Sequence, residues 1–212
     1  MPRFALISGV PRAGKSSLCD AITERHDGFT HVPLDRYVRP IPKGLTFLEW
    51  IATPACIAWD HLLGHIAILE SGSPCYTPRS DWDGGWGEWI SDGGALTDGP
   101  GRRMEPARVG YLVPGTHAFA FPASAGPAVR VFVQAPEHVI AERLSGVAHR
   151  GERASEVVRE WLGDNPRLIL EQEPMAELII DGTAARDDQV KRFVAFSASF
   201  FGVREEPDRA GR

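Results

Sequence analysis

Residues 4–18 read FALISGVPRAGKSSL, and this stretch decides the fold of the chain. Residues 4–8 form a short, continuous apolar run that is typical of a buried parallel strand. A cluster of glycine and proline follows the run, and the pattern over residues 16–24 predicts a helix. The stretch therefore predicts a strand, a loop and a helix in immediate succession.

The loop matches a known pattern at every specified position. Gly9, Gly14, Lys15 and Ser16 satisfy G-x-x-x-x-G-K-[ST]. Average residue frequencies produce such a match in roughly one chain of this length in a hundred. The alternative interpretation is a glycine-rich turn that carries a solvated lysine.

The residue types in the loop suit the binding of ATP and Mg²⁺. The two glycines allow main-chain N–H groups to approach phosphate oxygens closely, and the start of the helix adds partial positive charge. Lys15 would reach the β and γ phosphates, and the Ser16 hydroxyl would be a ligand of Mg²⁺. The expected nucleotide contacts are Gly9, Val10, Pro11, Arg12, Ala13, Gly14, Lys15, Ser16 and Ser17.

The rest of the chain alternates between strand and helix patterns. Thr53-Pro54 is expected to open a helix that stops at Gly72. This alternation predicts a parallel α/β sheet with right-handed crossovers. One domain is expected over residues 1–204, followed by a disordered polar tail at 205–212. Further strands are predicted at 30–34, 109–113, 129–135 and 178–180, and further helices at 136–145, 155–170 and 187–201.

The composition excludes several classes of protein. The 212 residues carry a formal net charge of −5, so the basic excess typical of nucleic-acid-binding domains is missing. No apolar run approaches the roughly 18 residues that a membrane-spanning helix needs. Three irregularly spaced cysteines form neither a disulfide framework nor a CxxC metal site. We expect a cytoplasmic protein without nucleic-acid or membrane partners, for which a homo-oligomer stays open.

Glycine, proline and tryptophan are unusually frequent. The 22 Gly and 17 Pro make 39 of 212 residues, about 18% against a usual sum near 12%. Periodicity disappears between residues 73 and 106, where Trp82, Trp86 and Trp89 lie within eight positions. Residues 73–107 are therefore predicted to form one long loop insertion.

Several other pieces of the sequence follow the loop in a familiar order. They are LDRYV, TPACIAWDHLLGHIAILESGSPCY, VGYLVPGTHAF, VRVFVQAPEHVIAERL, RGER and AELIID. Together with the loop, they resemble the uridine kinase and phosphoribulokinase family of P-loop small-molecule kinases over residues 4–180. The resemblance implies a three-layer P-loop NTPase sandwich with a parallel sheet of about five strands, helices on both faces and a short lid near 143–165. It also implies phosphoryl transfer from ATP to a hydroxyl of a small molecule that is nucleoside-like or sugar-like.

The resemblance implies catalytic roles as well. Asp35 would orient the acceptor hydroxyl or accept its proton, unless it only caps the following turn. Arg143, Arg150 and Arg153 lie in the part that resembles the lid, where arginines stabilise the charge that spreads during transfer, unless they are solvated helix residues. The expected catalytic residues are Lys15, Asp35, Arg143, Arg150 and Arg153.

Other side chains are candidates for binding the acceptor. Tyr37 would face it, or would be a packing tyrosine. Tyr76 matches the family's P-x-Y segment, and together with the tryptophans of the insertion it would stack on the acceptor or form a hydrophobic cluster under the loop. The expected acceptor contacts are Asp35, Tyr37, Asp60, Tyr76, Trp82, Trp86 and His117.

One position departs from the family pattern. The family has V-E-G at the end of the third core strand, with the Glu helping to bind Mg²⁺, whereas this chain has VPG at 113–115. Another metal ligand is needed beside Ser16, and Asp35, Asp81 and Asp83 are candidates. Two further functions stay open: a nucleotide-binding protein without phosphotransfer, which the missing acid favours, and a GTPase or regulatory module, for which an N/T-K-x-D segment is missing.

Overall fold

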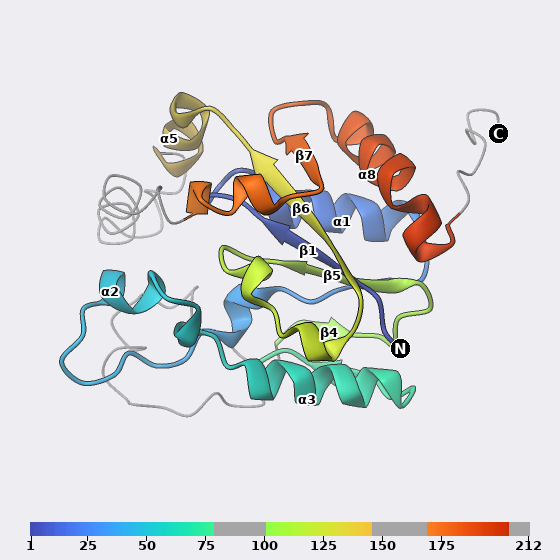
Figure 1. Cartoon of the computed structure of the whole chain (residues 1–212), viewed down its shortest axis with the longest axis horizontal. Helices are drawn as coiled ribbons and strands as arrows, with labels where there is room; N and C mark the ends of the chain where they lie inside the picture. Colours follow the sequence, from blue (N-terminus) through green and yellow to red (C-terminus); the bar gives the residue numbers. More distant parts are fainter. Residues whose placement is uncertain (79–100, 146–168, 204–212) are drawn as a thin grey trace.

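A computed structural model describes residues 1–78, 101–145 and 169–203 of the chain. Five parallel strands form one sheet in the order β2-β5-β1-β6-β7 (Figure 1), which confirms the α/β prediction. In open parallel sheets of this kind, ligands bind outside the carboxyl ends of the strands, near the point where the strand order reverses. The strands are β1 Phe4–Ser8, β2 Phe29–His31, β5 Gly110–Pro114, β6 Ala128–Gln134 and β7 Leu178–Asp181.

Helices cover both faces of this sheet (Figure 1). On one face, a Cβ at Gly110 would lie 2.3 Å from the ring of Phe201, so only glycine lets α8 pack this closely. On the other face, the rings of Phe4 and Tyr111 stack with centroids 5.5 Å apart, and the Tyr111 hydroxyl donates to Glu70 of α3 at 2.7 Å. The helices are α1 Lys15–Arg25, α2 Phe47–Ile51, α3 Trp59–Glu70, α5 Glu137–Ser145 and α8 Arg186–Phe201.

The helix that we predicted from Thr53 onward begins later in the chain. Thr53 caps only a 3-10 turn, η2 Pro54–Cys56. The N–H of Ala58 then donates to the carbonyl of Tyr37 at 2.8 Å, which ties this segment to the chain that follows β2. Helix α3 therefore starts at residue 59, and the prediction of one continuous helix was wrong.

Most other predicted elements are confirmed to within one residue. The exception among the strands is 30–34: β2 ends at His31, Pro33 has no N–H to donate, and a 3-10 turn, η1 Leu34–Tyr37, follows. Helix α2 was not predicted. The described helices include none long and apolar enough to cross a membrane.

A short antiparallel pair closes the base of the predicted insertion. Strand β3, Cys75–Tyr76, pairs with β4, Arg103–Met104. The Thr77 N–H donates to the carbonyl of Arg102 at 2.9 Å, and the Arg102 N–H donates to Oγ1 of Thr77 at 2.9 Å. These contacts form a stem at the two ends of the insertion.

Some predictions lie outside the described residues, because they fall within 79–100, 146–168 or 204–212. They are the predictions for Asp81, Trp82, Asp83, Trp86, Trp89, Arg150, Arg153, the helix at 155–170 and the tail.

Candidate active site

The loop between β1 and α1 depends on its glycines. Gly9 has a φ of +140°, and a Cβ on it would lie 2.2 Å from the carbonyl oxygen of Val133 in β6. Gly14, with a φ of +113°, takes the N-cap position of α1, where the described residues provide no capping side chain. The first N–H groups of α1 therefore keep the donor capacity that anion binding at a helix N-terminus requires.

Lys15 is folded back onto the loop. Its Nζ donates to the carbonyl oxygens of Gly9 at 2.8 Å and of Val10 at 2.9 Å. Burial lowers the pKa of Lys15 to about 8, and the negative charge of Asp35 opposes this shift. The structure thus brings the ammonium of Lys15 and the carboxylate of Asp35 within electrostatic reach of each other.

The sheet topology explains how these two residues meet. Lys15 begins the helix that follows β1, and Asp35 lies in the first turn of η1, which follows β2, so both stand at the carboxyl edge of the sheet. Asp35 and Ser16 are both exposed. A hydroxyl and a carboxylate are the oxygen ligands that Mg²⁺ prefers. The described part of the chain contains no group of three or more His, Cys, Asp or Glu residues that could hold a metal ion, so a metal here would need oxygens from the nucleotide or water as well.

Arg143, at the end of α5, contacts the loop differently from our expectation. Its guanidinium donates to the carbonyl oxygens of Arg12 at 2.9 Å and Ala13 at 3.2 Å. It also donates to the carbonyl of Gly182, after β7, at 2.9 Å. Because a cation is attracted to carbonyl oxygens, this side chain fastens the loop backbone to the turn after β7. These contacts give Arg143 a positioning role on the loop, and its contact with the transferred phosphoryl stays a prediction.

Two of the expected acceptor contacts lie in the interior. Tyr37 is 0% exposed, and its hydroxyl is 2.9 Å from Nδ1 of His65 in α3, which fits the packing alternative. His117 is 8% exposed, and its Nε2 donates to the carbonyl of Ile51 in α2 at 2.7 Å. Burial lowers the pKa of His117, so the neutral imidazole is favoured. Tyr37 thus joins η1 to α3, and His117 joins the segment after β5 to α2.

Two other candidates lie at the surface. The Asp60 carboxylate is 76% exposed and pairs with the guanidinium of Arg39. Arg39 lies four residues after Asp35 in the sequence. Tyr76 is 49% exposed and lies in β3, at the stem of the insertion. Both side chains are thus exposed to solvent.

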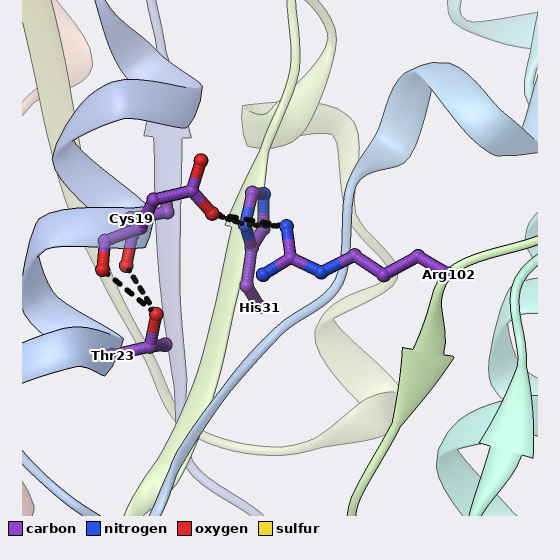
Figure 2. A network of polar contacts seen from close by, with 5 residues as sticks. Cys19, Thr23, His31 and Arg102 are labelled. Atoms are coloured by element: carbon purple, nitrogen blue, oxygen red, sulfur yellow. Dashed lines mark hydrogen bonds and ion pairs between the residues drawn. The ribbon is translucent and has the colours of Figure 1, made fainter.

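A polar network joins the stem to helix α1 (Figure 2). Nδ1 of His31, at the end of β2, lies 2.9 Å from Oδ1 of Asp20 in α1 and 2.7 Å from Nη1 of Arg102. Arg102 donates to the same Asp20 oxygen at 3.0 Å. The hydrogen bond from His31, and then that from Arg102, lower the pKa of Asp20 to about 2. Within the described ranges, Nε2 of His31 is buried and has no hydrogen-bond partner.

Gln172 is a residue that our sequence analysis missed. It lies between the undescribed segment 146–168 and β7, and its side-chain amide bonds to Ser8 and to Thr116 at the carboxyl edge of the sheet. A single polar residue in a stretch without periodicity gives no local signal for such a contact.

Comparisons with solved structures concern the fold. A candidate fructose transport system kinase from Silicibacter sp. TM1040 matches with a TM-score of 0.56 and 17% identity, over 84% of this chain and 89% of the other. The chain has the fold of a P-loop kinase. A sugar kinase from Janibacter sp. HTCC2649 is similar at a TM-score of 0.46 and 15% identity, over 92% of this chain and 94% of the other. A candidate uridine kinase from Bacillus stearothermophilus is similar at a TM-score of 0.46 and 13% identity, over 85% of this chain and 88% of the other. No protein-family model and no curated protein matches the sequence.

Proposed function

We propose that this chain is an ATP-dependent kinase that transfers the γ-phosphoryl group of ATP to a hydroxyl of a small molecule. One observation carries the proposal: Lys15, at the start of α1 after β1, and Asp35, in η1 after β2, stand at the same carboxyl edge of the sheet, where the charge of Asp35 acts on Lys15. An ammonium for the phosphates and a carboxylate for the acceptor hydroxyl are what direct phosphoryl transfer uses. Nucleoside-like and sugar-like acceptors are favoured.

The residues of the loop fit a nucleotide. Main-chain N–H groups over residues 9–16 would hold the phosphates, and Gly9 and Gly14 permit the backbone angles that this needs. The buried ammonium of Lys15, whose pKa is lowered to about 8, would regain stabilisation from an anionic phosphate. Ser16 and Asp35 would hold Mg²⁺, which neutralises charge on the phosphates when bound.

Transfer would proceed in line without a phosphoenzyme. Asp35 would accept a hydrogen bond from the acceptor hydroxyl and orient its oxygen toward the γ-phosphorus. A bond forms between that oxygen and phosphorus while the bond from phosphorus to the ADP oxygen breaks, and the hydroxyl proton passes to Asp35. Lys15 would stabilise the negative charge that develops on the phosphoryl oxygens and on ADP.

Release of ADP in the presence of nucleosides, sugars and other small alcohols tests the proposal. Lys15→Ala should lower turnover roughly a hundredfold or more, the scale of removing one preorganised charge-stabilising group. Asp35→Asn should lower kcat with a smaller effect on nucleotide binding. The matched controls are Lys191→Ala and Asp27→Asn, because Lys191 and Asp27 are exposed and lie outside the proposed site. Failure of every acceptor to stimulate turnover, in a protein that binds ATP, would contradict the proposal.

A nucleotide-binding protein without phosphotransfer is the second candidate. It is favoured by Pro114, which lies at the end of β5, where a kinase of the resembled family carries a metal-binding acid. Binding of ATP by wild type, with phosphotransfer no greater than that of Asp35→Ala, would support this candidate.

A further inference from the structure

A hydrogen-bonded cluster at the carboxyl edge of the sheet is separate from the groups proposed to act on the phosphates. The Ser8 hydroxyl lies 3.0 Å from the carbonyl oxygen of Thr116 and 2.9 Å from Oε1 of Gln172, as a shared donor to both. Nε2 of Gln172 donates to the same Thr116 carbonyl at 2.9 Å. One side-chain amide therefore joins the ends of β1 and β5, which are neighbours in the sheet.

The cluster lies where the chain leaves β1 for the loop. Ser8 is 0% exposed and directly precedes Gly9. The carbonyl of Val133 in β6 abuts Gly9 on one side, and the Gly115 N–H donates to the carbonyl of Ile7 at 3.0 Å on the other. The first residues of the loop are thus fixed between β6 and the turn that follows β5.

Gln172 is itself held in place by its backbone. Its N–H donates to the carbonyl of Ile169 at 3.0 Å, and its carbonyl accepts from the N–H of Met175 at 3.0 Å. Ile169 is 1% exposed, so its side chain anchors this turn in the core. The amide therefore stands on a fixed support rather than on a free chain.

We infer that Gln172 is a positioning residue that holds Ser8 and Thr116, and through them the phosphate-binding loop. An amide meets the chemistry of the cluster, because Oε1 accepts from the Ser8 hydroxyl while Nε2 donates to the Thr116 carbonyl. It does so without a charge, whereas an ionised carboxylate would place one oxygen against a carbonyl oxygen and add negative charge near the phosphates. The inference rests on the proposed nucleotide-binding function of the loop.

Gln172→Glu and Gln172→Leu test this role by titration calorimetry with ADP. Near pH 7.5 we expect both variants to bind ADP roughly three- to tenfold more weakly than wild type, the scale of one or two lost hydrogen bonds. A protonated Glu has one O–H donor and one acceptor oxygen, which match the one N–H and the one oxygen that Gln172 uses in this cluster, so Gln172→Glu should approach the wild-type affinity as the pH falls to about 4, near the ordinary Glu pKa. Gln172→Leu should stay weak at every pH.

Hydrogen exchange and a serine pair separate positioning from stability. Ser8→Ala removes the partner of Gln172, whereas Ser197→Ala removes a hydroxyl that is 2% exposed and donates to Phe193 within α8 at 2.8 Å. Exchange of the amides of residues 9, 10 and 12–14, in nucleotide-free protein, should be faster in Gln172→Leu and Ser8→Ala and unchanged in Ser197→Ala. Thermal unfolding of each variant confirms that it is folded at the assay temperature.

The outcomes keep the two proposals apart. Wild-type ADP affinity and loop exchange in both Gln172 variants would overturn the positioning role, as would an equal loss of ADP affinity in Ser197→Ala. If the variants behave as expected while no acceptor is phosphorylated, positioning is supported and the kinase proposal fails. If wild type does not bind ADP, nucleotide binding fails, and the exchange measurement still decides whether Gln172 holds the loop.

Discussion

Gly182 lies directly against the carbonyl oxygen of Ala13, and a Cβ on Gly182 would come within 1.9 Å of that oxygen. The Gly182 N–H also donates to the carbonyl of Gln134 at 2.7 Å, which holds the glycine at the end of β6. The turn after β7 is therefore packed against the backbone of the phosphate-binding loop.

Gly182→Ala should damage both the fold and the loop. Relief of the overlap with Ala13 requires backbone movement, for which we expect a loss of about 1–3 kcal/mol in the free energy of unfolding, together with weaker nucleotide binding. Urea unfolding and ADP titration measure the two effects. Gly64→Ala is the matched control: Gly64 lies within α3 with no heavy atom of another part within 4 Å of its Cβ position, and alanine there should stabilise the protein by about 0.5–1 kcal/mol. Unchanged ADP affinity in Gly182→Ala would contradict the importance of this contact.

Arg143→Lys should fail to replace arginine. A single ammonium cannot reproduce the fork that donates to Ala13 and Gly182 at once, so the nucleotide KM should rise roughly as much in Arg143→Lys as in Arg143→Ala. For a residue that positions the loop without contacting the transferred phosphoryl, kcat should change less than KM. Steady-state kinetics with varied ATP distinguishes the two parameters, and Arg192→Ala, at an exposed position of α8, is the control. A fall in kcat with unchanged KM would instead support direct contact with the phosphoryl group.

Above pH 8, the protein should take up protons at Lys15 when it binds a nucleotide. Burial lowers the pKa of Lys15 to about 8, so part of the population is neutral in this range, and a bound anion would favour the protonated form. Calorimetric titration near pH 8.5 in two buffers of different ionisation enthalpy measures this uptake. Lys15→Met should abolish it, and Lys191→Met should not. Equal binding enthalpies in the two buffers for wild type would show that Lys15 does not change protonation.

The same shift has a defined effect on stability. The pKa of Lys15 is about 8 in the folded protein against an ordinary value of 10.5, so between these pH values the unfolded chain binds more protons than the folded protein. The destabilising burial of the ammonium is therefore fully present below pH 8 and is relieved as the pH rises toward 10.5. Lys15→Met should remove this contribution from the dependence of unfolding free energy on pH.

The pKa of Asp20 should respond more to His31 than to Arg102. The His31 hydrogen bond is the larger cause of the low pKa of Asp20, about 2, and Arg102 adds to it. Carboxyl NMR titration should therefore show a larger rise in this pKa for His31→Phe than for Arg102→Met. Arg103→Met is the control, because Arg103 pairs with Glu105 at 2.9 Å instead. An Asp20 pKa that is the same in all three variants would contradict the network.

Stability in acid follows from the sign of this shift. The folded pKa of Asp20 lies below its ordinary 3.8, so the network stabilises the protein above about pH 4, and the stabilisation is lost as the pH falls toward 2. Arg102→Met should make the loss between these pH values smaller, as measured by urea unfolding at a series of pH values.

The core strands and the loop could be predicted because their signals are local. The apolar run at 4–8 and the branched residues at 129–135 each identify a strand without knowledge of the rest of the chain. The glycine and lysine spacing from Gly9 to Ser16 likewise predicts the loop before helix α1. From the resemblance, Asp35 was expected at the same edge, and its charge acts on Lys15 in the structure.

The features that were missed depend on distant partners. Strands β3 and β4 are two residues long and come together across an intervening segment, so neither has a recognisable pattern. The late start of α3 depends on a hydrogen bond from Ala58 to Tyr37, which no helix signal near Thr53 reveals. The bonds of Gln172 to Ser8 span 164 positions in the sequence, and only the folded sheet brings these residues together.

The pairing of β3 with β4 brings residues 78 and 101 close together, whatever segment joins them. A Cβ on Gly101 would lie 2.2 Å from the carbonyl of Thr77 and 2.9 Å from that of Pro78, so the two ends are already adjacent. Closing a loop between adjacent ends depends weakly on its length, with about 0.6 kcal/mol for each doubling. Segments of different length can therefore join residues 78 and 101 at a small cost in free energy, while the five-stranded sheet stays as it is.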